Sequence, residues 1–353
     1  LNDSGEVLSY NRMDPLGADT NNYEFINYLL MDPNDDDILY FPNGTKLWRN
    51  NTSSEFEYNN SQLRTNQGWD LFSDTSKREI TALDASTTPA NTVYMGTSDK
   101  YIYKIENANT GDPSFTQINN LPVGNGANIS AIEIDPTNDQ RVLVLTSNYK
   151  IYSLFFTDNG GESWKRVGGN LEETLSGGGN GPSMRTAEIA VLGSDTLYLV
   201  GGSTGLYATD KLEGVDTEWT LIGAQQFGGV VVENIQFRAQ DGKLIVGTHG
   251  TGIFTTTIES IYDVFPDLVS TQELKTKPFQ LFPNPATNFV NIEFDLNDKY
   301  EVMIVKDING KTIEELEINS NTLKYNTSKL KSGIYLISLS GESIYSTKKL
   351  IVE

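Results

Sequence analysis

The side chains able to do chemistry in this chain are mainly carboxylates, because its 353 residues include 47 Asp and Glu, one His and no Cys. Without Cys, disulfides and thiolate metal ligands are excluded. The one imidazole, His249, directly follows Gly247-Thr248 at the end of a predicted strand. An imidazole without a second His or a Cys makes a poor metal site. We therefore expect His249 to be a polar residue whose hydrogen bonds are satisfied inside the fold.

The densest group of carboxylates is Asp35, Asp36 and Asp37, in the segment that begins Asp32-Pro33. Carboxylate oxygens are the ligands that Ca²⁺ prefers, but calcium loops space them in a D-x-D-x-D-G register that this segment lacks. A solvated turn is the favoured interpretation, and a Ca²⁺ ion near these three residues is the alternative.

The charge of the chain limits its partners. A formal net charge of −21 excludes nucleic acid and an anionic membrane surface as partners, because this chain could not neutralise their negative charge. Residues 278–353 hold 8 basic and 10 acidic residues, so the first 277 hold 26 − 8 = 18 basic and 47 − 10 = 37 acidic ones. The acidity therefore belongs to the first part of the chain, where it favours solubility. No hydrophobic run approaches the ~18 residues of a membrane-spanning helix.

Short strands joined by Asn, Gly, Thr and Ser turns recur along the first part at intervals of about fifty residues. The first strands of five units align at Leu29, Leu83, Ile132, Ile189 and Ile235, with spacings of 54, 49, 57 and 46. Second strands follow at residues 38–41, 93–97, 142–145, 197–200 and 244–248, and third strands at 101–103, 151–152, 206–207 and 253–254. Fourth strands carry an aromatic residue and an apolar residue three positions later, as in Trp219 and Ile222.

Four short strands per repeat are typical of a β-propeller blade. The fifth unit stops after its third strand, near Ile258, and a strand from residues 1–22, around Val7-Leu8, could complete it. We expect an all-β fold in which residues 1–262 are the C-terminal blades of a larger propeller that begins upstream of Leu1.

A turn between the third and fourth strands of the third unit identifies the kind of propeller. It contains Thr157, Asn159, Gly160, Gly161, Ser163 and Trp164. Asn159-Gly160 is suited to the positive φ angles of a tight hairpin, with Trp164 packed back under it. The segment resembles the Asp-box, S-x-D-x-G-x-x-W, of sialidases and sortilin-type receptors, except that Asn159 stands at the Asp position. In that family the box is a structural turn, so the resemblance implies stability and not chemistry.

Because some Asp-box propellers are glycosidases, we ask whether this chain carries a catalytic site. Sialidases need three arginines, and the eight Arg of this chain are scattered without the Arg-Ile-Pro signature. Glycosidases of the xyloglucanase type use two carboxylates, and 47 acidic residues allow no choice of a pair. We assign no catalytic residues and expect a binding or adhesion module. A glycoside hydrolase with catalytic residues mostly upstream of Leu1 is the alternative.

After residues 263–277, which have the composition of a linker, residues 278–353 predict a small Ig-like β-sandwich. Six strands are expected at 290–294, 300–305, 312–316, 323–326, 333–339 and 346–352. Four motifs stand in order: Phe282 to Ala286, Asp307 to Lys311, Leu330 to Tyr335, and Lys348 to Val352. Their characteristic residues are Pro283, Asn284, Pro285, Gly310, Gly333, Tyr335, Lys348 and Lys349. This segment resembles the type A sorting domain of the type IX secretion system.

The sorting-domain resemblance implies a route and partners. The protein would enter the periplasm, cross the outer membrane of a Gram-negative bacterium through the type IX translocon, and be secreted or held at the cell surface. A shuttle β-barrel would recognise the domain, with the exposed sheet edge and the Lys348-Lys349 tail as contacts. A sortase-like peptidase would cleave within residues 263–278. The propeller would bind a surface polysaccharide or a protein.

Overall fold

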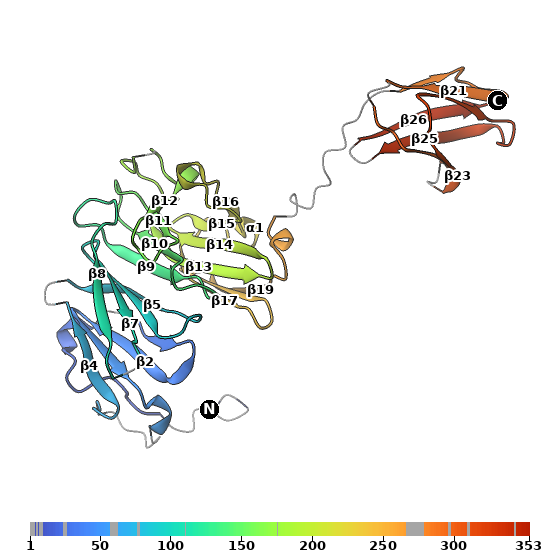
Figure 1. Cartoon of the computed structure of the whole chain (residues 1–353). Coiled ribbons are helices and arrows are strands. Elements are labelled where there is room, and N and C mark those ends of the chain that lie inside the picture. Colours follow the sequence, from blue (N-terminus) through green and yellow to red (C-terminus); the bar gives the residue numbers. More distant parts are fainter. Residues whose placement is uncertain are drawn as a thin grey trace. The chain divides into compact units, whose positions relative to one another are not determined.

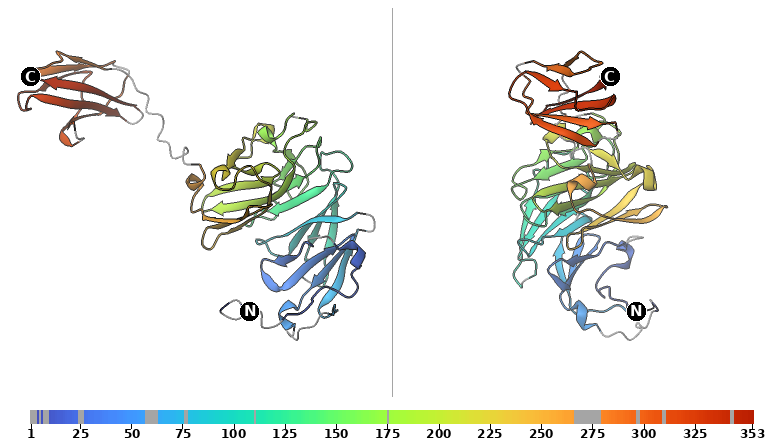
Figure 2. Two further views of the ribbon diagram at one scale, coloured as in Figure 1. Left: turned by 180° about the vertical axis from the view of Figure 1, so that it is seen from behind. Right: turned by 90° about the vertical axis from the view of Figure 1, so that its right-hand side faces the viewer.

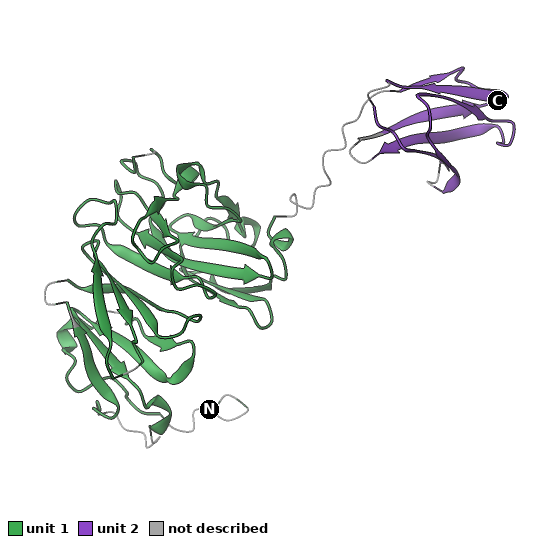
Figure 3. Cartoon of the chain, viewed as in Figure 1, with its two compact units in different colours: residues 1–265 green, residues 266–353 purple. Residues whose placement is uncertain are grey.

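The structure is a computed structural model of the whole chain. It describes residues 4, 6, 10–23, 27–56, 63–75, 78–109, 111–174, 176–265, 279–295, 298–308, 311–341 and 344–353. The chain divides into two compact units, Leu1–Phe265 and Pro266–Glu353 (Figure 3). Each unit is described by itself.

The described residues of the first unit form five antiparallel sheets, each built from strands that follow one another in the chain. Sheet one holds β1 (Leu30–Asp32), β2 (Asp35–Asn43), β3 (Lys46–Asn50) and β4 (Trp69–Asp74), and sheet two holds β5 (Ile80–Ala85), β6 (Thr92–Thr97), β7 (Ile102–Glu106) and β8 (Ser114–Ile118). Sheet three holds β9 (Ile129–Ile134), β10 (Val142–Thr146), β11 (Leu154–Thr157) and β12 (Lys165–Arg166). Sheet four holds β13 (Met184–Leu192), β14 (Asp195–Gly202), β15 (Gly205–Thr209) and β16 (Thr220–Ile222), and sheet five holds β17 (Val232–Arg238), β18 (Lys243–Thr248) and β19 (Gly252–Thr257).

Short helical turns connect the strands. They are η1 (Thr20–Asn22), η2 (Ser53–Glu55), η3 (Gly169–Leu171), η4 (Gly214–Asp216), α1 (Ala224–Phe227) and η5 (Ile261–Asp263).

The five sheets are propeller blades that follow one another around an arc (Figures 1 and 2). The first strands of successive sheets, β1, β5, β9, β13 and β17, are neighbours in that order and form the inner wall of the unit. This confirms the all-β fold with repeated four-stranded units that the sequence predicts. Sheet five has three strands among the described residues, and Val7-Leu8, expected to complete it, lie outside them.

Alternation along the strands explains the stacking of the blades. In β10, the fully buried Val142 and Val144 belong to the core cluster shared with sheet two, whereas Leu143 and Leu145 belong to the cluster shared with sheet four. Successive strand residues point to opposite faces, so a continuous apolar run serves two interfaces. The face of sheet one turned away from sheet two is covered by the N-terminal segment, where the Trp69 Nε1–H group donates to the Met13 carbonyl over 2.7 Å.

The predicted third strand of the third unit is wrong. We expected it at Ile151-Tyr152, but β11 begins at Leu154, because Lys150 adopts a positive φ of 64° and residues 147–153 form the turn that precedes the strand. The strand β3 has no counterpart among the predicted third strands, although Leu47 and Trp48 on it are buried.

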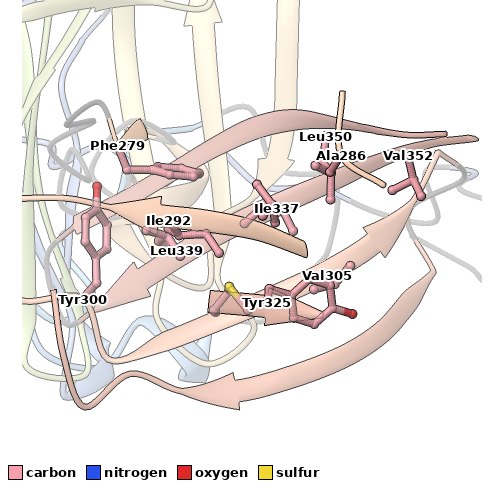
Figure 4. Close-up of a cluster of buried hydrophobic side chains, with 12 residues drawn as sticks. Phe279, Ala286, Ile292, Tyr300, Val305, Tyr325, Ile337, Leu339, Leu350 and Val352 are labelled. Carbon is pink, nitrogen blue, oxygen red and sulfur yellow. The ribbon is translucent and has the colours of Figure 1, made fainter. Parts of the chain in front are cut away.

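The second unit is two sheets packed face to face. One holds β20 (Gln280–Phe282), β21 (Phe289–Glu293) and β24 (Thr322–Asn326), and the other holds β23 (Thr312–Glu317), β22 (Val302–Asp307), β25 (Gly333–Gly341) and β26 (Ile344–Val352), in that order. Side chains from both sheets, such as Ile292 and Leu339, are fully buried in one core (Figure 4). The six predicted strands are present and β20 is added; the immunoglobulin-like label stays a prediction.

The first unit extends three residues beyond its predicted limit of 262. Asp263 completes a capping box with Ser260 at η5, and the buried Ile261 and the nearby Phe265 pack against the core of sheets four and five. Of the predicted linker 263–277, the residues after 265 lie outside the described part of the chain.

Candidate functional sites in the two units

The predicted motif around Asn284 forms a strap across the outer edge of β26. The strap is residues 283–286, between β20 and β21. The Asn284 Nδ2–H group donates to the Lys349 carbonyl over 2.7 Å, and the Ile351 N–H group donates to Asn284 Oδ1 over 2.9 Å. The Asn284 side chain thus pairs with β26 as a backbone segment would.

The end of the strap continues this pairing with its own backbone. Ala286 N–H donates to the Ile351 carbonyl over 2.8 Å, and Glu353 N–H donates to the Ala286 carbonyl over 3.0 Å. Ala286 is fully buried and Val352 is 3% exposed. The last strand is therefore hydrogen-bonded on both sides at its C-terminal end, and its core residues are held against the sandwich.

The other motif residues support the same strand. Gly333 and Tyr335 lie at the start of β25 opposite Val352 and Leu350 of β26, and the Tyr335 hydroxyl donates to the Lys331 carbonyl over 2.8 Å. Gly310 lies outside the described residues. Three of the four motifs, those around Asn284, Gly333 and Lys349, therefore meet at β26, whereas Asp307 to Lys311 connects β22 with β23.

Lys348 and Lys349 do not form one basic patch. They are adjacent on β26, so their side chains point to opposite faces. The Lys348 ammonium lies 5.7 Å from the centroid of the buried Phe279 ring, while Lys349 is exposed. The strap occupies the adjacent edge of β26, and contact of Lys348 and Lys349 with the shuttle stays a prediction.

The hairpin at residues 157–164 joins β11 to β12 as predicted, and Asn159 organises it. Asn159 Oδ1 accepts from the Thr157 hydroxyl over 2.8 Å and from Ser163 N–H over 3.0 Å, and Asn159 Nδ2 donates to Ser163 Oγ over 2.8 Å. The positive φ angles belong to Gly160 (67°) and Gly161 (91°), not to Asn159. A Cβ atom at Gly161 would overlap the Ile118 side chain of sheet two, so this turn of sheet three packs closely against sheet two.

Trp164 and Trp219 are equivalent aromatics in units three and four with different burial. Trp164 is half-buried and its Nε1–H group donates to Asn120 Oδ1 over 3.1 Å, whereas Trp219 is 3% exposed and donates to the Val167 carbonyl over 2.8 Å.

We expect Trp219→Ala to lower the free energy of unfolding by about 3–5 kcal/mol and Trp164→Ala by about 1–3 kcal/mol. Urea unfolding followed by far-UV circular dichroism measures both, and a larger loss for Trp164→Ala would contradict the assignment.

Three carboxylates line the inner wall of the first unit, one on each of β5, β9 and β13. Asp84 Oδ2 accepts from Ile134 N–H over 2.7 Å, Glu133 Oε1 accepts from Ile189 N–H over 3.4 Å, and Glu188 is bonded by the Phe237 N–H group. Each carboxylate therefore links its inner strand to the next one.

Burial is the main cause of abnormal acidity in these three groups. It raises the pKa of Asp84 to about 7 and that of Glu188 to about 8. It also raises the pKa of Glu133 well above its ordinary value, where the nearby Glu188 and Asp84 add repulsion. Removal from water disfavours the charged form of a carboxyl. The hydrogen bonds give the three groups a structural role at the blade interfaces.

The remaining predicted sites are exposed, except Asp37, which is half-buried. His249 is 79% exposed, with Nδ1 4.0 Å from Glu233 Oε1, so the expectation of a histidine satisfied inside the fold is wrong. Asp35, Asp36 and Asp37 begin β2, where Asp35 Oδ1 accepts from Asp37 N–H and Asp37 Oδ1 accepts from Ser54 N–H.

In the described part of the chain, no three His, Cys, Asp or Glu side chains are grouped so that they could hold a metal ion. Nor do the described residues include a helix with the length and apolarity needed to span a membrane.

Comparison with known families matches one part of the chain. Residues 280–353 match the family described as the secretion system C-terminal sorting domain. The match includes the strap and all strands of the second unit. The chain is therefore secreted by the type IX system and exported through the outer membrane to the cell surface or the extracellular space. A search of curated proteins gives no match.

Comparison with solved structures gives distant likenesses. An ancestral GH74 enzyme is 12% identical over 91% of this chain and 45% of its own, with a TM-score of 0.45. A chain from a structure of the mitotic checkpoint complex is 9% identical over 98% of both chains, with a TM-score of 0.42. Raptor of Chaetomium thermophilum is 12% identical over 92% of this chain and 28% of its own, with a TM-score of 0.39. This chain spans less than half the length of the first of these, and none of the three bears on function.

Proposed function

We propose that this chain is an extracellular binding protein whose second unit is its export signal and whose first unit binds a surface polysaccharide or protein. The observation that carries the proposal is the strap of residues 283–286. It gathers motif residues from both ends of the second unit onto β26, so that the export signal is a folded surface and not a linear peptide.

The partner of this surface is the outer-membrane shuttle barrel of the type IX machinery, followed by a sortase-like peptidase. Cleavage between the units, within residues 263–278, would release residues 1–262 as the mature protein. The match to a sorting domain supports the first partner, and the division of the chain after Phe265 supports two separately handled parts.

A binding role for the first unit is favoured over catalysis by what its carboxylates do. Asp84, Glu133 and Glu188 accept hydrogen bonds from the backbone of the next inner strand. One oxygen of Asp84 and one of Glu133 are thus occupied by a hydrogen bond between blades, which favours a structural role for these groups. The hairpin at residues 157–164 likewise joins blades.

The export proposal is tested with the chain behind a cleavable periplasmic signal, expressed in a bacterium with a type IX system. We expect the full chain outside the cell and a chain ending at Phe265 in the periplasm. Deleting the translocon should retain the full chain as well. All four Trp lie in the first unit, so the fluorescence spectrum of the shortened chain shows that its propeller still folds. Equal export of the two chains would disprove the role of the second unit.

A further inference from the structure

A polar cavity opens where the five inner strands begin. Its volume is about 440 Å³, within the range of small-molecule sites. Its walls include Tyr28 before β1, Thr81 on β5, Asn128 before β9, Arg185 on β13 and Glu233 on β17. Because every blade contributes, the cavity lies at the axis of the first unit, and we call it the axial pocket.

The axial pocket is lined mainly by neutral groups that both donate and accept hydrogen bonds. These are the amides and hydroxyls of Asn22, Asn27, Tyr28, Thr81, Asn128, Ser130 and Ser147. Several are fixed in place: Asn128 Nδ2 donates to Ser147 Oγ over 3.0 Å, and Ser130 Oγ donates to the Met184 carbonyl over 2.9 Å. The bond to Ser147 uses one of the two Asn128 N–H groups and leaves its oxygen as an acceptor. A preorganised set of this kind lowers the entropic cost of binding.

Tyr28 provides an aromatic surface at this site. Its side chain is half exposed, yet its hydroxyl donates to the Leu83 carbonyl over 2.9 Å, which fixes the ring. Tyr28 lines the cavity with its ring held at the polar end. An oriented aromatic ring beside hydroxyl and amide groups suits a ligand with C–H faces and many hydroxyls.

The charges around the axial pocket exclude anionic ligands. Among its lining residues Glu79 and Glu233 oppose the single cation Arg185, whose guanidinium lies 3.5 Å from Glu233 Oε1. The whole chain carries a net charge of −21. Polyanions would be repelled. A peptide is less suited, because only Tyr28, Pro42 and Ile80 of the lining are apolar.

We propose that the axial pocket binds a neutral oligosaccharide, with Tyr28 stacking against a sugar ring and Asn128 hydrogen-bonding its hydroxyls. This inference rests on the proposed extracellular binding role of the first unit. It assigns that role to one end of the propeller axis and to one class of ligand.

The test uses the purified full chain, fluorescently labelled, on an array of neutral, sialylated and sulfated glycans, followed by calorimetry with the best neutral glycan. We expect a neutral glycan to bind, with Tyr28→Ala and the isosteric Asn128→Asp each weakening it at least tenfold. Tyr149→Ala, which changes an exposed tyrosine that does not line the pocket, should stay within twofold of the unmodified chain. Tryptophan fluorescence checks that all three variants fold.

Three results would overturn the axial pocket as a saccharide site. They are no binding on the array, binding only to sialylated or sulfated glycans, and neutral-glycan binding that neither pocket variant weakens. If Tyr28→Ala fails to fold, Asn128→Asp alone decides between the outcomes. Export of the chain is measured independently, so failure of this inference and failure of the export proposal are distinguishable.

Discussion

Replacing Asn284 with alanine should reduce the amount of chain that reaches the medium at least tenfold, while entry into the periplasm is unchanged. The Asn284 side chain is the group that attaches the strap to Lys349 and Ile351. Each lost hydrogen bond at this exposed edge costs about 0.5–1.5 kcal/mol, and the released edge of β26 presents unpaired backbone groups. The export signal then loses the part of the strap that covers Lys349 and Ile351, while the backbone bonds of Ala286 to β26 remain. Quantitative immunoblots of medium, periplasm and whole cells measure the ratio.

Two further variants make this result specific. Asn284→Asp keeps the acceptor for Ile351 N–H but has no donor for the Lys349 carbonyl, so we expect an intermediate export level. Asn319→Ala changes an exposed asparagine in the loop between β23 and β24 and should export normally. Full export of Asn284→Ala, with a protease-resistant second unit, would show that the strap is not part of the signal.

The strap also shows what the sequence could not predict. The motif around Asn284 was recognisable by its residue types, but its partners Lys349 and Ile351 are 65 and 67 positions away. Local patterns contain no information on such a pairing. Deleting residues 348–353 would therefore be a poor test of docking, since it removes the fully buried Leu350 and the partner of the strap together.

The blades, by contrast, were predictable because each strand carries its own alternation and each sheet is built from consecutive strands. The inner-wall carboxylates were missed through one alignment error. Asp84, Glu133 and Gln236 each follow a first-strand residue of the repeat, Leu83, Ile132 and Ile235. We aligned Ile189 with these, whereas the bonds to the next strand align Ala187, so that Glu188 falls beside Glu133. In the correct register the series Asp84, Glu133, Glu188, Gln236 is a visible signal.

The inner-wall carboxylates predict an unusual pH dependence for the first unit. A carboxyl whose pKa is raised in the folded state holds a proton that the unfolded chain releases. Its favourable contribution is complete below the unfolded pKa, near 4.5 for Glu, and is lost as the pH rises through the folded pKa. For Asp84 the loss extends from about pH 3.8 to about pH 7, and for Glu188 from about pH 4.5 to about pH 8. Raising the pH from 5 to 9 should therefore destabilise the propeller through these groups.

Glu133→Gln isolates this effect at the central carboxylate. We expect it to raise the free energy of unfolding by about 1–3 kcal/mol at pH 9 and to change it little at pH 4. The amide oxygen can still accept from Ile189 N–H, while the buried charge and its repulsion with Asp84 and Glu188 are removed. Urea unfolding followed by tryptophan fluorescence measures it in the full chain, because all four Trp lie in the first unit.

The difference between the Glu133→Gln variant and the unmodified chain cancels the titration of groups that the two share. A matched control is Glu162→Gln, which neutralises an exposed carboxylate on the hairpin and should give the same small difference at every pH. A gain for Glu133→Gln of equal size at pH 4 and pH 9 would mean that the effect comes from packing. No gain at pH 9 would mean that water reaches the inner wall and keeps Glu133 solvated. A gain confined to high pH would show that the buried Glu133 carboxylate, once ionised, destabilises the inner wall of the first unit.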